Sequence, residues 1–326
     1  MSLDSDVIVD RRRIRRKLTF WRVTSAVIAI AAIVAVGVIA TPSGRSALTS
    51  SGSIARVNIE GLIRSDQDRV EALERLENSQ TAAVVVHINS PGGTTAGSEQ
   101  LYDSLTRLKA KKPLVVVVEG LAASGGYITA IAADHIVAQQ SSLVGSIGVL
   151  FQFPNFTGIL KTVGVQVEEV KSSPLKAAPN GFEPTSPEAR AALEALVKDS
   201  YAWFRDLVKS RRGMDDELLE KVADGRVFTG RQAVDLKLID QLGDEKTAVA
   251  WLVAEKNVKP DLPVRNYTLS PRFGDLTFLR TAASITLDAL GLSSIARHVE
   301  QAGVAQAVDR LGLDGMLALW RPAGAD

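Results

Sequence analysis

The chain has 326 residues, of which 38 are Lys or Arg and 37 are Asp or Glu, so its net charge at pH 7 is +1. This balance lacks the basic surplus that is typical of nucleic-acid-binding proteins, and we expect no nucleic-acid partner. The absence of cysteine excludes disulfides and thiolate chemistry. None of the three histidines has a second histidine at metal-ligand spacing, so we expect no metal and no cofactor.

The first 52 residues divide into three stretches by composition. Residues 1–22 contain seven Arg or Lys side chains, and the uncharged run VTSAVIAIAAIVAVGVIA follows them. An apolar run of about 18 residues just suffices to cross a bilayer as a helix, and a basic cluster before it stays on the cytoplasmic side. We expect a basic cytoplasmic segment (1–22), a transmembrane anchor (23–41) and a flexible linker (42–52). A cleaved signal peptide that ends near Ala40 is the alternative.

Strand and helix patterns alternate in the next part of the chain. Apolar and β-branched runs predict strands, and helical spacing predicts helices, in the order strand Ile54–Ile59, helix Arg69–Leu76, strand Ala82–Ile88, helix Ser98–Leu108 and strand Val115–Val118. This order predicts right-handed βαβ crossovers and a mostly parallel sheet. Two more short strands are expected at His135–Ala138 and Leu143–Val149, and later helices at about 186–210, 215–223 and 230–236. The domain so formed covers residues 53–267, and a helical C-terminal extension (268–326) follows it.

One stretch carries the strongest signal for chemistry, PLVVVVEGLAASGGYITAIAA from Pro113 to Ala133. Four consecutive valines bounded by Pro and Gly are typical of a strand that is buried on both faces. Ser124 then lies on the turn from this strand to a helix, where free N–H groups and the helix dipole favour developing negative charge. The alternative is that Ser124 serves only as the N-cap of that helix.

The strand before it leads into Asn89-Ser90-Pro91-Gly92-Gly93, which we expect to form a loop at the carboxyl edge of the sheet. Ligands of open α/β sheets bind at this edge. A hydroxyl from one loop and free N–H groups from another form the layout of a nucleophile with an oxyanion hole. A phosphate cradle is the weaker interpretation, because neither GxxxxGK[ST] nor GxGxxG occurs.

A serine nucleophile needs a base. His87 and His135 lie in apolar strands, where core or edge positions are the simpler interpretation, and His298 lies in the C-terminal extension. A lysine serves as the base if it is uncharged, which requires burial and no carboxylate partner. Lys176 fits this description in one respect, since no acidic residue occurs between positions 170 and 181. Position in the sequence alone is weak support for a base.

Five segments taken together resemble the signal peptide peptidase A family of membrane-anchored serine proteases. They are NSPGG (89–93), ASGGY (123–127), GSIGV (145–149), the paired lysines in KSSPLK (171–176) and DGRVFTGRQA (224–233). The resemblance spans about residues 54–252. It implies an α/β fold with a ClpP/crotonase-like core and a Ser–Lys dyad.

The resemblance assigns roles residue by residue. Ser124 matches the nucleophile, Lys176 the general base and Lys171 the flanking lysine. The N–H groups of Gly92 or Gly93, and of Gly125, match the oxyanion hole. Pro174, which stands before Lys176, departs from the family's pattern.

The resemblance also implies partners and a location. It predicts a homo-oligomeric ring, by resemblance an octamer, in which the serine of one subunit meets the lysine of the next. Substrates would be leftover signal peptides and unfolded membrane-derived segments, and the catalytic domain would lie on the extracytoplasmic (periplasmic) side of the cytoplasmic membrane. Two alternatives are a crotonase-like enzyme acting on acyl-thioesters and a non-catalytic, membrane-tethered scaffold that binds hydrophobic peptides.

Overall fold

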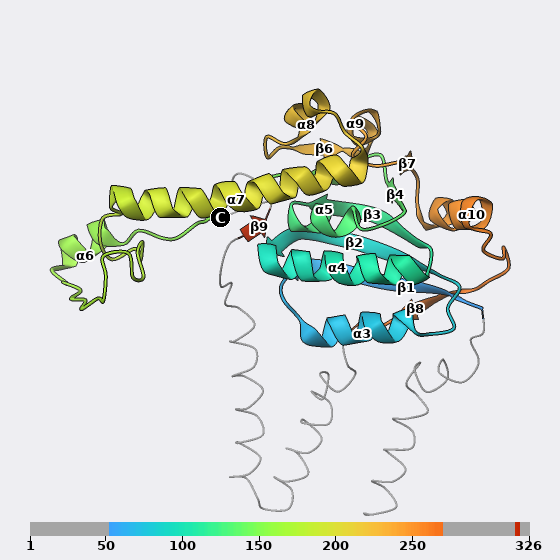
Figure 1. Cartoon of the computed structure of the whole chain (residues 1–326), viewed down its shortest axis with the longest axis horizontal. Helices are drawn as coiled ribbons and strands as arrows, with labels where there is room; N and C mark the ends of the chain where they lie inside the picture. Colours follow the sequence, from blue (N-terminus) through green and yellow to red (C-terminus); the bar gives the residue numbers. More distant parts are fainter. Residues whose placement is uncertain (1–51, 270–316, 320–326) are drawn as a thin grey trace, which may run out of the picture. The chain divides into compact units, whose positions relative to one another are not determined.

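The computed structural model describes residues 52–269 and 317–319, which form an α/β fold around one mixed sheet (Figure 1). The strand order is β6-β5-β3-β2-β1-β8; β4 pairs with β3 and β7, and β9 pairs with β2. The strand bounds are β1 Ile54–Ile63, β2 Ala83–Thr94, β3 Leu114–Ala123, β4 His135–Ala138, β5 Leu143–Gly145, β6 Val227–Thr229, β7 Gln241–Leu242, β8 Val264–Tyr267 and β9 Leu317–Leu319.

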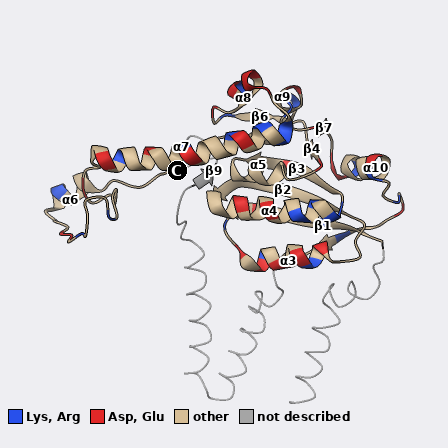
Figure 2. Cartoon of the chain, viewed as in Figure 1, with Lys and Arg blue, Asp and Glu red and all other residues tan. Residues whose placement is uncertain are grey.

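Within the described residues, helices lie where the sequence predicts them, and two more that it does not predict lie at residues 157–163 and 245–256. Their bounds are α3 Gln67–Glu77, α4 Thr95–Lys111, α5 Gly125–Ala130, α6 Thr157–Val163, α7 Pro187–Arg212, α8 Asp216–Val222, α9 Gly230–Asp235 and α10 Glu245–Lys256. The longest, α7, starts where Ser186 accepts a hydrogen bond from the N–H of Ala189, and it ends at Gly213 in the left-handed conformation. The charged side chains lie mainly on the helices and outer loops (Figure 2).

The central strands β1, β2 and β3 are parallel, and β3 is buried on both faces from Leu114 to Val118. In β3, Val116 and Val118 pack in one core with α3, α4, α5 and α7, whereas Val115 and Val117 pack in a second core with α10. Because successive side chains of a strand point to opposite faces, a run of valines supplies both cores at once. This confirms the prediction of a buried strand that leads to Ser124.

The structure corrects two local predictions. The NSPGG segment forms no loop, since β2 continues through it to Thr94 while β1 runs alongside, with Leu62 paired to Gly92 and Ile63 to Gly93. The predicted strand 143–149 stops at Gly145, because Ser146 has a φ of 52°, which breaks the extended conformation. Both differences arise from backbone pairing or backbone angles that the residue pattern does not reveal.

The predicted segments 1–22 and 23–41 lie outside the described residues, as do almost all of the linker 42–52 and most of the extension 268–326. Across residues 52–269 and 317–319, no helix is both long enough and apolar enough to span a membrane. The anchor therefore stays a prediction from the sequence.

Candidate active site

Ser124 lies on a strained turn between β3 and α5. Its φ of 53° and ψ of −116° are outside the regions that residues with a side chain normally adopt. It stands at the N-cap position of α5, but its side chain makes no capping hydrogen bond. The interpretation of Ser124 as a mere N-cap is therefore not supported. Backbone strain of this kind is frequent at functional positions.

The GSIGV segment holds Ser124 from one side. The N–H of Ser124 donates to the carbonyl of Gly145 at 2.8 Å, and its hydroxyl donates to the carbonyl of Gly148 at 3.3 Å. The N–H of Ser146 in turn donates to the carbonyl of Arg226 at 2.8 Å, and β5 pairs with β6. The DGRVFTGRQA segment thus holds GSIGV by backbone hydrogen bonds, and GSIGV in turn holds Ser124 by hydrogen bonds.

The ASGGY segment is fixed from the other side. A Cβ on Gly126 would lie 2.7 Å from the carbonyl oxygen of Ser90, so only glycine lets α5 approach β2 this closely. Tyr127, the third residue of α5, is fully buried and donates its hydroxyl to the carbonyl of Leu238 at 2.7 Å. Burial raises the pKa of Tyr127, which therefore stays a neutral donor.

The three predicted oxyanion-hole glycines differ in what their N–H groups do. Gly92 donates its N–H to the hydroxyl of Ser90 at 3.1 Å, and that hydroxyl donates to the carbonyl of Gly61 at 2.7 Å. Gly93 lies in β2 beside Ile63. Within residues 52–269, the N–H of Gly125 has no hydrogen-bond acceptor, as expected for the first residue of a helix. Gly125 is thus the donor that is free to bind an anion.

The NSPGG part of β2 lies close to the turn that carries Ser124. The last pair between β2 and β3 joins Ser90 to Ala122. A Cβ on Gly126 would lie 2.7 Å from the carbonyl oxygen of Ser90, so the turn that carries Ser124 lies against this part of β2. The two segments that the sequence predicted to meet at the carboxyl edge therefore do so.

Lys176 is not brought to Ser124 within this chain. It is an exposed residue of a turn that follows α6, and its N–H donates to the carbonyl of Ser173. Figure 1 shows α6 and the neighbouring loops at the N-terminal end of α7, whereas α5 packs near the other half of that helix. A base for Ser124 has to come from elsewhere or from another copy of the chain.

The two lysines of the KSSPLK segment have different surroundings. Lys171 forms ion pairs with Glu169 at 2.6 Å and Glu183 at 2.5 Å. The hydrogen bond to Glu169 is the main cause of a raised pKa of Lys171, which keeps this amine protonated. Lys176 forms no ion pair with any residue of the described ranges. Of these two lysines, Lys176 is the one without a carboxylate partner among the described residues, as a lysine base requires.

The histidines take no part in this site. The ring nitrogens of His87 lie 2.7 Å from carboxylate oxygens of Glu119 and Glu245, and His135 stacks on Trp251 with 4.6 Å between ring centroids. His298 lies outside the described residues. Among the residues that the structure describes, no group of acidic or histidine side chains is arranged to hold a metal ion.

Sequence reasoning missed two contributors. Ser90 binds the N–H of Gly92 and contacts the start of α5, and the carbonyl of Gly148 accepts the Ser124 hydroxyl. Both belong to motifs that the sequence singled out, NSPGG and GSIGV. Their roles depend on distances between segments, which no spacing along the chain reveals.

Comparison with known proteins agrees with this arrangement. Residues 106–259 match Peptidase family S49, and residues 62–142 match the Clp protease family. The putative protease slr0021 of Synechocystis is 36% identical over 210 residues, which cover 64% of this chain and 76% of that protein. The chain belongs to peptidase family S49. The predictions of the signal peptide peptidase A family, of a serine peptidase and of a ClpP-like α/β core are confirmed.

Other relatives in family S49 are longer than the matching region. Protease 4 of Haemophilus influenzae is 30% identical over 227 residues, which cover 66% of this chain and 37% of that protein. The putative signal peptide peptidase SppA of Enterococcus faecium is 32% identical over 183 residues, which cover 56% of this chain and 53% of that protein. The chain thus spans from about a third to three quarters of the length of these S49 relatives.

Proposed function

We propose that this S49 peptidase is a membrane-anchored endopeptidase that degrades residual signal peptides and unfolded membrane-derived segments, with Ser124 as nucleophile and Lys176 as general base. The observation that carries the proposal is the Ser124 turn. Its backbone is strained, its hydroxyl makes no cap bond, and it follows the last β2–β3 pair, Ser90 with Ala122, by two residues. A relative named as a signal peptide peptidase supports the substrate class.

The proposed reaction proceeds through an acyl-enzyme. The uncharged amine of Lys176 takes the proton of Ser124 as its oxygen attacks the peptide carbonyl carbon, and the N–H of Gly125 stabilises the resulting oxyanion. The C–N bond then breaks, and the protonated lysine gives its proton to the leaving amine. Water attacks the ester with Lys176 again as base, which releases the acid product and restores Ser124.

We propose further that Lys176 reaches Ser124 from a neighbouring subunit. Of the twelve large apolar side chains that are exposed in the described residues, eleven lie between positions 150 and 196, in and around the segment that carries Lys176. Monomeric proteins rarely expose so much apolar surface in one region. Burial of this surface against a second copy would also remove water from Lys176, which favours the uncharged amine.

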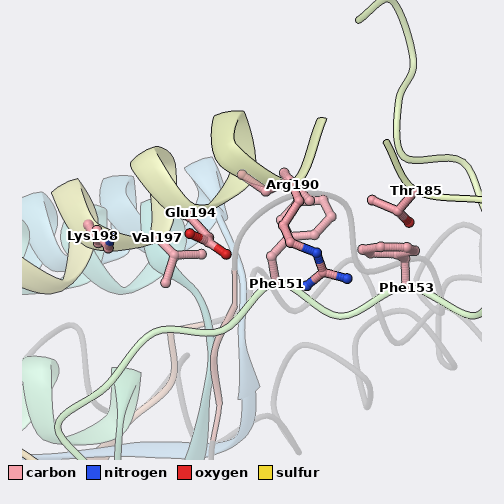
Figure 3. Close-up of a pocket in the computed structure, with 8 residues that line it drawn as sticks. Phe151, Phe153, Thr185, Arg190, Glu194, Val197 and Lys198 are labelled. Carbon is pink, nitrogen blue, oxygen red and sulfur yellow. The ribbon is translucent and has the colours of Figure 1, made fainter. Parts of the chain in front are cut away.

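A groove on the same segment offers a place for such contact. It measures about 310 Å³ and lies between α7 and the irregular stretch that carries Phe151 and Phe153 (Figure 3). Phe151 and Phe153 form its apolar wall, and Arg190 and Glu194 of α7 lie beside them. An apolar wall with charged side chains beside it is typical of a protein interface. A ring of subunits, eight by family resemblance, is the assembly that we propose.

The location follows from the segments that lie outside the described residues. The basic cluster in 1–22 and the apolar run that follows support a single-pass anchor with a cytoplasmic N-terminus. The peptidase domain would then face the extracytoplasmic (periplasmic) side, where cleaved signal peptides remain in the membrane. The crotonase-like alternative fits this location poorly, because acyl-thioester chemistry belongs in the cytoplasm.

The test uses the full chain in detergent with a synthetic signal peptide. Ser124→Ala and Lys176→Ala should each abolish cleavage without changing the mass of the assembly. If wild type binds the peptide but does not cleave it, the scaffold alternative replaces the proposal. If Lys176→Ala remains active, the base is another residue.

Co-assembly of the two inactive variants tests the shared dyad. In a randomly mixed ring, about a quarter of the sites pair an intact Ser124 with an intact Lys176 from the neighbour. Co-expression of the two variants should therefore restore about a quarter of the wild-type activity. No restoration in mixed assemblies of normal mass would show that both residues act within one subunit.

A further inference from the structure

The C-terminal end of α7 binds the end of α5. Arg211, the penultimate residue of α7, donates from Nε to the carbonyl of Ile131 at 2.8 Å, and from Nη2 to the carbonyls of Ala132 and Ala133 at 3.3 and 3.0 Å. These carbonyls directly follow the last residue of α5. Carbonyls at the end of a helix lack an intrahelical donor, and an arginine is well suited to bind them. One side chain therefore holds the whole end of α5.

Three arginines in this half of α7 bind three different parts of the domain. Arg205 forms an ion pair with Glu220 of α8. Arg212 forms an ion pair with Asp240 at 2.7 Å, which fixes the loop before β7. Arg211 is the one whose hydrogen bonds, within the described residues, go to the segment that ends α5. Its contacts with α5 are thus separate from the contacts that attach α7 to α8 and to the β7 loop.

At its other end, α5 begins with the strained residue Ser124. A backbone with φ 53° and ψ −116° persists only where the surrounding structure holds it. The N–H of Ser124 is held by the carbonyl of Gly145, and its own carbonyl accepts from the N–H groups of Tyr127 and Ile128 at 2.9 and 3.0 Å. The strained residue is therefore part of the first turn of α5, and any shift of that helix changes its backbone angles.

α5 is short enough to transmit such a shift along its whole length. Its six residues, Gly125–Ala130, are all buried and span about 9 Å. Phe204 and Val208 of α7 lie in the same core, and Figure 1 shows α5 beside this half of α7. Close-packed interiors yield little and pass displacements on to their neighbours. Loss of the contacts at one end of α5 should therefore be felt at Ser124.

We propose that Arg211 is a positioning residue for Ser124. By binding the carbonyls that follow α5, it keeps the helix in the place that the strained turn requires, and the Ser124 oxygen keeps the position from which it attacks the peptide carbonyl carbon. The inference rests on the proposed function, because Arg211 has this role only if Ser124 is the nucleophile.

The first test compares two arginines of α7 in the full chain in detergent. A misplacement of about 1 Å costs roughly 10²-fold in rate, so a smaller shift of α5 in Arg211→Met should lower kcat for a signal peptide about tenfold, with KM and the mass of the assembly unchanged. Arg205→Met makes the same chemical change at the contact with α8 and should keep the wild-type kcat. A wild-type kcat in Arg211→Met would overturn the inference. If Arg211→Met does not assemble, Arg211→Lys is measured instead, since an ammonium lacks the planar fork that binds several carbonyls.

A second test separates positioning from a merely structural role. In a peptide aldehyde, the Ser124 oxygen adds to the aldehyde carbon and its proton passes to the aldehyde oxygen, whereas the corresponding peptide alcohol only binds. Arg211→Met should raise the inhibition constant of the aldehyde about tenfold and leave that of the alcohol unchanged. An equal change in both constants, or in neither, would overturn the inference. A wild-type chain that neither cleaves the peptide nor prefers the aldehyde would refute the proposed function, and the role of Arg211 with it.

Co-assembly shows which subunit Arg211 acts in. In rings mixed from the Ser124→Ala and Lys176→Ala chains, the intact serine comes from the Lys176→Ala chain. Arg211→Met added to that chain should lower the restored activity about tenfold, whereas the same change in the Ser124→Ala chain should have no effect. Equal losses from both placements would mean that Arg211 acts through the segment that carries Lys176, and would overturn the inference.

Discussion

The N–H of Ser124 donates to the carbonyl of Gly145 at 2.8 Å, which ties the candidate nucleophile to a strand outside its own motif. Gly145 accepts this bond with a φ of 100°, a conformation that residues with a side chain rarely adopt. The position of Ser124 therefore depends on a glycine 21 residues away in the sequence.

Gly145→Ala should impair catalysis more than folding. An added Cβ would be strained by the positive φ and would lie 3.2 Å from the ring of Phe228, at a cost of about 1–3 kcal/mol of folding free energy. Displacement of Ser124 should lower kcat on the order of 10²-fold. Gly148→Ala is the comparison for stability, because its Cβ would make only ordinary contact, 3.6 Å from Gly225. A kcat of Gly145→Ala equal to that of wild type would contradict the dependence on Gly145.

Lys176→Met and Lys171→Met should differ sharply. Loss of a general base lowers kcat by roughly 10²–10⁴-fold, which we expect for Lys176→Met. Lys171 is held protonated by its two glutamates, and an ion pair near the surface contributes little to stability. Lys171→Met should therefore change kcat less than about tenfold. The reverse order of the two kcat values would assign the base to Lys171.

Charges on α6 should dissociate the assembly. Ile159 and Val163 are 65% and 63% exposed, so the double substitution to Asp should change the stability of an isolated subunit little, by about 0.5 kcal/mol or less per site. In an interface the same charges lose water without a partner, and the mass by light scattering should fall toward that of one chain. Lys221→Asp makes an equal charge change, of −2, at an exposed polar site of α8 and should keep the assembly. An unchanged mass for the double variant would remove α6 from the interface.

Glu245 should make the domain sensitive to acid. Its carboxylate accepts two hydrogen bonds from Arg56, each at 2.5 Å, and these bonds lower the pKa of Glu245 below its ordinary value of 4.5. A lowered folded-state pKa means that the stabilisation is complete above the ordinary value and is lost as the pH falls through the folded-state pKa. We expect Glu245→Gln to cost about 1–2 kcal/mol of unfolding free energy at pH 7. The difference from wild type should shrink as the pH approaches 3, and thermal melts across this range would show whether it does.

Much of the fold could be predicted from local signals. The valines of β3 predict a buried strand, because a continuous β-branched run between Pro and Gly is typical of a strand with both faces in the core. Ser186 followed by Pro187 marks the start of α7 with equal clarity. The extension of β2 through NSPGG could not be predicted, since β1 stabilises it through hydrogen bonds that join residues about 30 positions apart.

By itself, the sequence determined the α/β class, the five motifs and the candidate pair Ser124 and Lys176. The tertiary structure alone decided that GSIGV supports Ser124, that Gly125 keeps a free N–H and that Lys171 is held by glutamates. It also separated Lys176 from Ser124 within one chain and paired β9 with the end of β2. The physical reason is range: strand and helix signals depend on neighbouring residues, whereas these contacts depend on how distant segments pair across the sheet.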